Sequence, residues 1–267
     1  MSERSSHEDS FEKHRRYLLS VAYRMMGSVA DAEDVVQEAF IRWRSVDRTS
    51  VRNPKASLSM TVSRLCLDAL QSARARRETY VGPWLPEPVL GEGALRVDDA
   101  SELAQDISMA LMMALERSEA ACRQLVSRAR AHVQAARPRY TPSRDEAERV
   151  VRAFGAAVLT GDIEALQAVL SENAVLYPDG GGRVLSALRP IFGRDRVVRF
   201  LLGVTKKFPL GESARFSEEM INGVPGFYVE EEGRPVQTMA FDSRDGRIAC
   251  VYVVRNPDKL IRLASPM

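Results

Sequence analysis

The sequence predicts a multidomain chain, with an all-α N-terminal half followed by an α+β domain. Apolar residues recur every three or four positions through the first half, which is the spacing of a buried helix face. Neither Gly nor Pro interrupts residues 102–136, whereas after residue 144 strand-like runs alternate with turns. These changes of pattern place the expected boundaries at 1–79, 80–101, 102–137, 138–144 and 145–267.

Length and composition indicate a globular protein and argue against several other classes of protein. The chain has 267 residues, enough for two ordinary domains. We expect a cytoplasmic protein without a membrane segment or signal peptide, because no apolar run reaches about 18 residues and residues 1–10 are polar. Three cysteines, Cys66, Cys122 and Cys250, are scattered and lack metal-ligand spacing, so neither a disulfide framework, a metal site nor a cofactor is expected.

The first section is expected to be helical. Residues 11–26 and 30–43 have helical apolar spacing, and the break at 27–28 leaves Ser28 as a candidate N-cap. A polar loop then leads through Asn53 and Pro54, a turn signal, into a long helix over 56–77 with a basic end.

Two linkers flank the middle section. Residues 80–93 contain prolines and glycines around a WLPEP sequence at 84–88, which excludes a regular helix or strand. Residues 102–136 predict one continuous amphipathic helix, or a helical pair with a very tight break. Pro138 and Pro142 end this helix and open the second linker.

The last section predicts helices first and a run of antiparallel strands after them. Helices are expected at 145–159, 162–170 and 194–204, and a turn at 178–182. The expected strands are 174–177, 214–221, 225–231, 235–241 and 246–256.

Charge alternates along the N-terminal half. Residues 31–38 carry four acids and no base, whereas residues 123–139 carry five arginines and no acid. Taken alone, such faces are more often ordinary solvated helix surfaces than binding sites.

Several ordered motifs together resemble one family. The run 22–40 closely resembles the polymerase-binding helix of sigma-70 proteins, and the basic helix over 63–78 looks like their promoter −10 helix. WLPEP at 84–88, DGGGR at 179–183 and NPDKL at 256–260 are similar to signatures of an extracytoplasmic-function sigma subgroup with a SnoaL-like C-terminal extension. The resemblance implies a sigma region 2 domain, a truncated region 4 helix and a cone-shaped SnoaL-like domain.

The resemblance implies two partners for region 2, the clamp helices of the largest subunit of core RNA polymerase and promoter DNA. The residues expected to bind polymerase are Asp34, Gln37, Glu38, Phe40 and Arg42. The residues expected at the −10 element are Asn53, Arg64, Asp68, Arg74, Arg76 and Arg77. Ser57 stands where relatives usually have a tryptophan, and this change is expected to remove core packing.

Region 4 departs most from the family. Residues 107–117 resemble its first helix and 118–132 its recognition helix, but the two helices normally between them are absent. We expect the remnants to fuse into one long helix that cannot form a standard helix-turn-helix, and we therefore expect sequence-specific recognition of the −35 element to be lost. The residues expected to retain DNA contacts are Arg123, Gln124, Ser127, Arg128 and Arg130.

The resemblance implies that the C-terminal domain regulates the sigma factor in cis and does not catalyse a reaction. His7, His14 and His132 all lie outside it, which excludes a histidine-dependent mechanism. Acid or base roles for Asp179, Tyr177, Asp242 and Tyr252 are not singled out by any spacing, and no catalytic residue is assigned. The expected regulatory contact is made by Trp84, Pro86, Glu87, Asp179, Gly180, Gly181, Gly182, Arg183, Asn256, Asp258 and Lys259. The resemblance to SnoaL-like domains also implies a conical pocket, in which an unspecified small-molecule ligand would bind.

Three functions therefore remain. The leading hypothesis is a sigma factor that directs promoter-specific initiation and is tuned by its own C-terminal domain. A second hypothesis is a degenerate paralogue that binds polymerase without specific −35 recognition, motivated by the missing helices and by Ser57. A third is a SnoaL-type small-molecule enzyme with a vestigial N-terminus.

Overall fold

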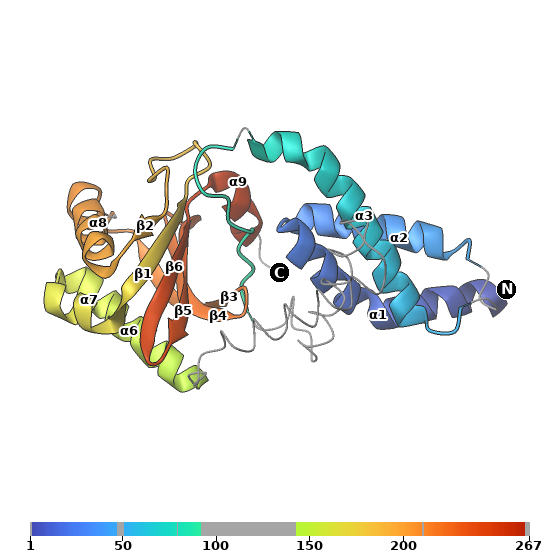
Figure 1. Cartoon of the computed structure of the whole chain (residues 1–267), viewed down its shortest axis with the longest axis horizontal. Coiled ribbons are helices and arrows are strands. Elements are labelled where there is room, and N and C mark those ends of the chain that lie inside the picture. The colour runs from blue at the N-terminus through green and yellow to red at the C-terminus, as the bar shows by residue number, and fades with distance from the viewer. Residues whose placement is uncertain (1, 47–50, 79, 92–142, 210, 265–267) are drawn as a thin grey trace. The chain divides into compact units, whose positions relative to one another are not determined.

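The structure is a computed structural model that describes residues 2–46, 51–78, 80–91, 143–209 and 211–264. The chain divides into two compact units (Figure 1). The N-terminal unit comprises Met1–Glu78 and Gly93–Arg137, and the C-terminal unit comprises Thr79–Glu92 and Pro138–Met267. None of the helices within the described ranges is both long and apolar enough to cross a membrane.

Three packed helices form the described part of the N-terminal unit. They are α1 (Ser2–Met26), α2 (Val29–Trp43) and α3 (Pro54–Glu78). The predicted N-cap is confirmed, because the Ser28 side chain accepts a hydrogen bond from the main-chain N–H of Asp31 at 3.3 Å. Asn53 does the same for α3, accepting from Ala56 at 3.2 Å.

The apolar stripes of these helices meet in one core. Leu18 and Val21 of α1, Val36 and Trp43 of α2, and Val62 of α3 are all buried. Burial of these side chains supplies the main force that holds the unit together. The helices predicted at 11–26, 30–43 and 56–77 are therefore confirmed, although α1 begins nine residues before its predicted start.

The C-terminal unit combines helices with one sheet. Its helices are α6 (Arg144–Thr160), α7 (Ile163–Val169), α8 (Arg194–Lys207), α9 (Pro257–Leu260) and the 3₁₀ helix η2 (Ile261–Ala264). Its strands are β1 (Leu170–Asp179), β2 (Ile191–Phe192), β3 (Arg215–Ile221), β4 (Val224–Glu231), β5 (Arg234–Arg244) and β6 (Arg247–Val254).

The strand order is β2-β1-β6-β5-β4-β3. The predicted run of antiparallel strands is confirmed for β3 to β6. The earlier strand β1 was given no pairing from sequence, and it joins β6 in parallel, with Tyr177 opposite Tyr252 and Asp179 opposite Val254. The predicted turn at 178–182 begins too early, because β1 continues to Asp179 and the turn follows it. Pairing with β6 supplies the main-chain bonds that keep this end of β1 extended.

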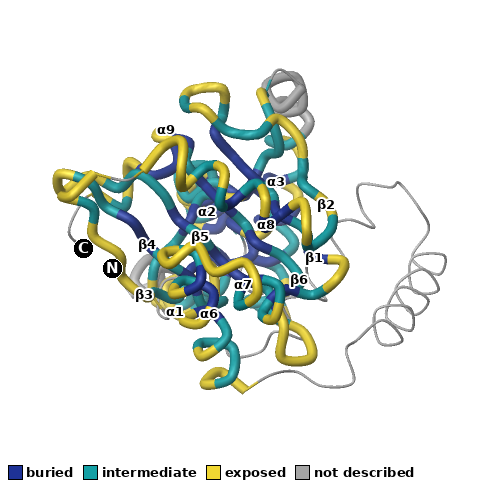
Figure 2. The backbone as a smooth tube through the Cα atoms, turned by 90° about the vertical axis from the view of Figure 1, so that its left-hand side faces the viewer, coloured by how far each residue is buried: buried dark blue, intermediate teal, exposed yellow. Residues whose placement is uncertain are grey.

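The two faces of the sheet are covered by different elements (Figure 1). Helices α6, α7 and α8 pack on one face, where Phe154, Leu176, Phe241 and Val251 belong to the larger core. Residues 80–91, α9 and η2 cover part of the other face, around a smaller core that includes Leu85. The buried segments are dark blue in Figure 2.

Three strand pairs end in matching two-residue turns. Asn222, Glu232 and Asp245 each have a φ between 51° and 52°, and each is followed by a glycine with positive φ. Such X-Gly turns suit the twist of antiparallel hairpins. The hairpin strands were predicted from sequence, whereas the two-residue β2 and the short α9 were missed because neither is long enough to show a period. The predicted helix at 102–136 lies outside the described residues.

Candidate functional site

The linker over residues 80–91 packs along the C-terminal unit. Its main anchor is Asp179, the last residue of β1, whose side chain is fully buried. The side chain of Leu176 points into the core between the sheet and helices α6, α7 and α8. Because side chains alternate along a strand, those of Tyr177 and Asp179 point to the opposite face, toward the linker. Asp179 thus lies on the sheet face that the linker crosses.

Three donors converge on the Asp179 carboxylate. Lys259 Nζ lies 2.7 Å from Oδ2 and the main-chain N–H of Leu85 lies 2.9 Å from the same oxygen. The Tyr80 hydroxyl donates to Oδ1. Burial, and next the hydrogen bond to Asp179, raises the pKa of Tyr80, so this hydroxyl keeps its proton and remains a donor at physiological pH.

Lys259 completes the same cluster. Helix α9 positions it, beginning at Pro257 behind an Asn256 cap whose side chain accepts from Asp258 N at 3.1 Å. The Lys259 side chain is 8% exposed, and its ammonium also donates to the Leu85 carbonyl. It lies 4.3 Å from the centre of the Trp84 ring and 4.8 Å from that of Tyr80.

The buried ion pair between Asp179 and Lys259 mainly fixes the position of the linker, and it adds little to the free energy of unfolding. Removing two charges from water costs several kcal/mol, which is offset when every remaining donor and acceptor is bonded. Here the Leu85 N–H and C=O bind the two charges, so the linker backbone completes the pair. Loss of the linker from this place would leave Asp179 and Lys259 with unmet bonds.

The glycine turn after β1 is shaped by the same cluster. Gly181 has a φ of 59°, and a Cβ there would lie 2.3 Å from Asn256 Nδ2. That amide nitrogen donates to the Tyr80 hydroxyl at 3.0 Å. Arg183 and Asp258 then form an ion pair at 3.2 Å on the exposed rim, where its contribution to stability is small.

A second anchor holds the far end of the linker. Asn222, in the β3–β4 turn, accepts from Val89 N at 2.8 Å and donates to the Glu87 carbonyl at 3.3 Å. The main chain adds bonds from Asn222 N to Val89 O at 3.0 Å and from Gly91 N to Met220 O at 2.9 Å. We call the two anchors together the linker clamp, defined by Tyr80, Asp179, Asn222, Asn256 and Lys259.

The structure brings together most of the residues expected at the regulatory contact. Trp84, Asp179, Asn256 and Lys259 meet directly, and the glycine turn, Arg183 and Asp258 lie beside them. Glu87 contributes its carbonyl, whereas Pro86 is exposed. Sequence reasoning missed Tyr80 and Asn222, which stand outside the motifs. It placed a turn between the strands at 214–221 and 225–231, but that turn carried no signal of a bond to the linker.

The expected polymerase-binding residues lie on α2. Asp34 and Gln37 are exposed, and Glu38 pairs with Arg42 at 2.8 Å. Phe40 is half-buried and its ring lies 5.0 Å from that of Phe11, so it contributes to internal packing. Ile41 was not predicted; it is 56% exposed, next to these polar residues.

The expected −10 residues map onto α3 and its N-terminus. Arg64 and Asp68 are exposed one turn apart, hence on one face of the helix. Asn53 is exposed and caps α3. The backbone of Arg74, Arg76 and Arg77 is helical, but their side chains lie outside the described part of the structure. The expected −35 residues, 123–130, also lie outside it.

The four residues considered for acid or base chemistry are all engaged elsewhere. Asp179 is in the linker clamp, and Asp242 binds Arg244 at 2.9 Å. The rings of Tyr177 and Tyr252 stack with centroids 5.5 Å apart, and burial raises the pKa of Tyr252. Within the described ranges, no group of three or more His, Cys, Asp or Glu residues could hold a metal ion.

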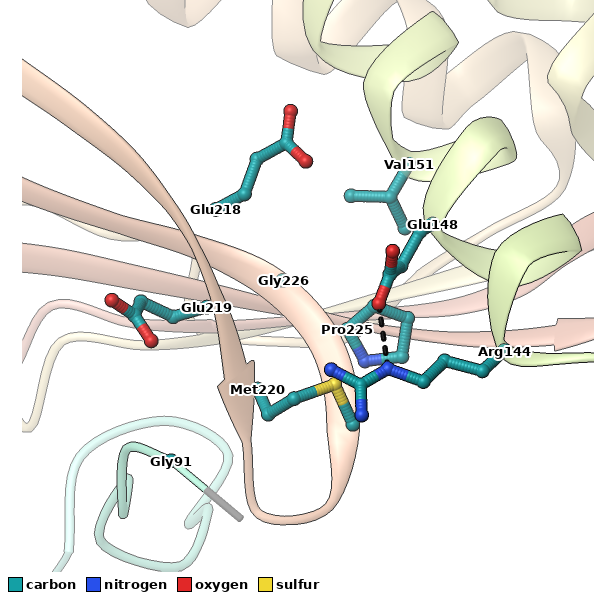
Figure 3. Close-up of a pocket in the computed structure, with 9 residues that line it drawn as sticks. All are labelled: Gly91, Arg144, Glu148, Val151, Glu218, Glu219, Met220, Pro225 and Gly226. Atoms are coloured by element: carbon teal, nitrogen blue, oxygen red, sulfur yellow. Dashed lines mark hydrogen bonds and ion pairs between the residues drawn. The ribbon is translucent and has the colours of Figure 1, made fainter.

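A pocket of about 320 Å³ lies between the start of α6 and the β3–β4 hairpin (Figure 3). Its charged lining includes Glu148, Glu218 and Glu219, and Arg144 bonds to Glu148 at 2.8 Å. The interior of the domain between α6 and the sheet is filled instead by rings, with Phe241 packed edge-on against Phe154.

Comparison with known protein families identifies the N-terminal helical unit. Residues 10–76 match the model of sigma-70 region 2. The chain is 38% identical to the ECF RNA polymerase sigma factor SigJ of Mycobacterium tuberculosis over 93% of its length and 91% of that protein. It is 30% identical to the probable ECF sigma factor SigI of the same species, over 74% of this chain and 76% of that one.

A solved structure agrees with these sequences. The crystal structure of M. tuberculosis SigJ matches with a TM-score of 0.69 and 33% identity, covering 97% of this chain and 99% of that one. The chain therefore belongs to the extracytoplasmic-function RNA polymerase sigma factors, with a SnoaL-like C-terminal domain. As a member of this family it is a transcription initiation factor that binds core RNA polymerase and promoter DNA, and not an enzyme. The SnoaL-type enzyme hypothesis is thus wrong.

Proposed function

We propose that this sigma factor directs promoter-specific initiation in the cytoplasm through α2 and α3, and that its C-terminal unit regulates it in cis by holding the linker. In this proposal α2 binds the clamp helices of the largest polymerase subunit. The exposed polar side chains of Asp34 and Gln37, one turn apart beside Ile41, support this role. The arginines of α3 bind the −10 DNA.

Introducing positive charge on α2 tests the polymerase contact. We expect the double variant Asp34→Lys/Gln37→Lys to lose affinity for core polymerase and to lose specific transcripts, because both side chains are exposed at the proposed interface. Glu12→Lys is the control, since it reverses an exposed charge on a different helix, α1. Unchanged affinity in the double variant would remove α2 from the contact.

The observation that carries the regulatory proposal is the buried pairing of Asp179 and Lys259 around the backbone of Leu85. Residues 80–91 continue from the end of α3 and lead into the remainder of region 4. A free stretch of 12 residues could extend to roughly 40 Å, whereas the clamp holds these residues along the sheet. We therefore propose that the clamp restrains the chain that follows region 2 and lowers activity until it opens.

Amide hydrogen exchange tests the clamp in the full-length protein. Asn222→Gly keeps the positive φ of the turn but removes the side chain that binds Val89 and Glu87. We expect faster exchange at residues 87–91 than in the wild type. Glu232→Gly is the matched control, because it makes the same change in the β4–β5 turn. Equal exchange in the two variants would contradict the second anchor.

A second candidate function is a sigma factor that binds polymerase without specific −35 recognition. The alignment with SigJ extends over 288 positions, more than the 267 residues of this chain, so SigJ has residues without a counterpart here. A shortened region 4 would account for such residues. Transcription from templates with and without a −35 element distinguishes the two: equal yields favour the second candidate.

A small-molecule ligand would find room in the pocket of Figure 3. The carboxylates of Glu148 and Glu218, against the single guanidinium of Arg144, favour a ligand with a cationic group. Calorimetric titration with spermidine tests this assignment, with Glu218→Gln as the variant expected to weaken binding. Absence of heat at millimolar spermidine would argue against a cationic ligand.

A further inference from the structure

Strand β3 forms one edge of the sheet. The β3–β4 hairpin closes at Ile221 and Val224, and hydrogen-bonded pairs then alternate along the ladder. The main-chain groups of the odd-numbered residues 215–221 therefore face β4, and those of the even-numbered residues 216–220 face outward. The bond from Gly91 N to Met220 O, 2.9 Å long, agrees with this assignment.

The linker covers the C-terminal end of this edge. Leu90 bridges Ile221, and Gly91 binds Met220. Among the residues that the structure describes, none donates to or accepts from the outward main-chain groups of Phe216 and Glu218. The side chains of residues 215–218 are exposed, with Phe216 at 49%. Such an edge is a template for another strand.

The charges along β3 are arranged symmetrically about Ser217. Arg215 lies two residues before it and Glu219 two residues after it, both on one face of the strand. Figure 3 shows Glu219 leaving the strand on the side opposite Glu218. When this sequence is aligned antiparallel with itself about Ser217, Arg215 of each copy lies opposite Glu219 of the other.

We propose that β3 pairs with β3 of a second copy of this chain, antiparallel about Ser217. In that register Phe216 lies opposite Glu218 of the partner subunit, and these outward-facing residues exchange both N–H···O=C bonds. The two-fold axis repeats the exchange, so four main-chain hydrogen bonds and two Arg-Glu pairs form. Cross-strand pairs of opposite charge stabilise such a ladder.

The chain's own continuation fits the edge less well. In the register set by Leu90 and Ile221, a continuing strand would place Glu92 opposite Glu219 and Arg96 opposite Arg215. Like charges directly opposite one another destabilise a strand pair. A second copy is therefore the better occupant by charge.

The contact is small. Stable protein interfaces bury at least about 1,200 Å², and a few residues of strand pairing fall below that size. The dimer is consequently reversible and depends on concentration, and it weakens as salt screens its ion pairs.

Molar mass measured by light scattering across a concentration series tests the pairing in the full-length protein. We expect the mass to rise from 29.7 kDa toward twice that value at high concentration and low salt. Arg215→Glu and Glu219→Arg, each alone, place like charges opposite each other and should stay monomeric. An equimolar mixture of the two variants, and the double variant, restore opposite charges and should dimerise.

Two further variants distinguish the contribution of main-chain pairing at the β3 edge from that of the charged side chains. Phe216→Pro removes an outward N–H without breaking a β3–β4 bond, and should abolish the dimer. Arg247→Glu, an exposed charge at the β5–β6 hairpin, is the control that should dimerise like the wild type.

A wild-type protein that remains monomeric at every concentration would overturn the proposal, as would a dimer that persists in both single charge variants. A monomer with slow amide exchange at Phe216 and Glu218 would assign the edge to another segment of the same chain. The pairing does not rest on the regulatory proposal, and polymerase affinity of Arg215→Glu should be unchanged.

Discussion

Lys259 is a cation almost completely removed from solvent, and its charge is balanced by Asp179. Lys259→Met leaves that carboxylate buried without a counter-ion, so we expect it to lower the free energy of unfolding of the C-terminal unit by about 3–5 kcal/mol. Tyr80→Phe removes one hydrogen bond from the same carboxylate and should cost about 1–3 kcal/mol. The measurement is urea unfolding followed by Trp84 fluorescence in a Trp43→Phe background.

Lys206→Met in the last turn of α8 is the control for that series, because Lys206 is exposed and its loss should change little. A cost for Lys259→Met no larger than for Lys206→Met would show that the pair is not buried in solution.

Cys66 gives the N-terminal unit a pH dependence. Burial in the core raises the pKa of its thiol from 9.0 to about 12. The folded state therefore keeps a proton that the unfolded chain loses, and stability that is present below pH 9 falls as the pH rises through about 12. The expected slope is about 1.4 kcal/mol per pH unit in this window.

The Cys66→Ala variant isolates this effect, since other groups titrate equally in both proteins. Urea unfolding at several pH values between 8 and 11 should give a shallower decline for the variant than for the wild type. Parallel declines would assign the alkaline loss of stability to other groups.

At the scale of elements, two helix glycines are expected to respond oppositely to alanine. A methyl group added at Gly203 in α8 would meet open space, so Gly203→Ala should stabilise the helix by about 1 kcal/mol. At Gly155 in α6 the same methyl would lie 2.6 Å from the Phe227 ring, so the ring must move and the gain is lost. Thermal unfolding of the two variants checks this contrast; an equal rise in Tm for both would contradict the packing of α6 on β4.

Elements with strong local signals could be predicted from the sequence. Helical apolar spacing and the Ser28 cap located α2, and strand-like runs with turns between them located β3, β4 and β5. The parallel pairing of β1 with β6 could not be predicted from the sequence, because it joins residues more than 70 positions apart and has no local signature. Family motifs identified Asp179 and Lys259, but their bonding to Leu85 depends on that pairing and on the cap of α9.

At the scale of the whole molecule, the linker belongs to the C-terminal unit although it continues from α3. The WLPEP motif was expected to be a connection between domains, and its composition correctly excluded helix and strand. Composition could not show that Leu85 completes a buried ion pair and that Val89 and Gly91 bond to the β3–β4 hairpin. These contacts arise from the tertiary fold, since Asn222 lies 133 residues from Val89.

The most direct test of the regulatory account is in vitro transcription with purified full-length protein and core polymerase, on the promoter upstream of its own operon. The double variant Tyr80→Phe/Asn222→Gly loosens both anchors of the linker clamp, with Glu232→Gly as control. The account predicts specific transcripts from the wild type and the control, and a higher yield from the double variant at equal polymerase occupancy. An unchanged or lower yield from a folded, polymerase-bound double variant would contradict it.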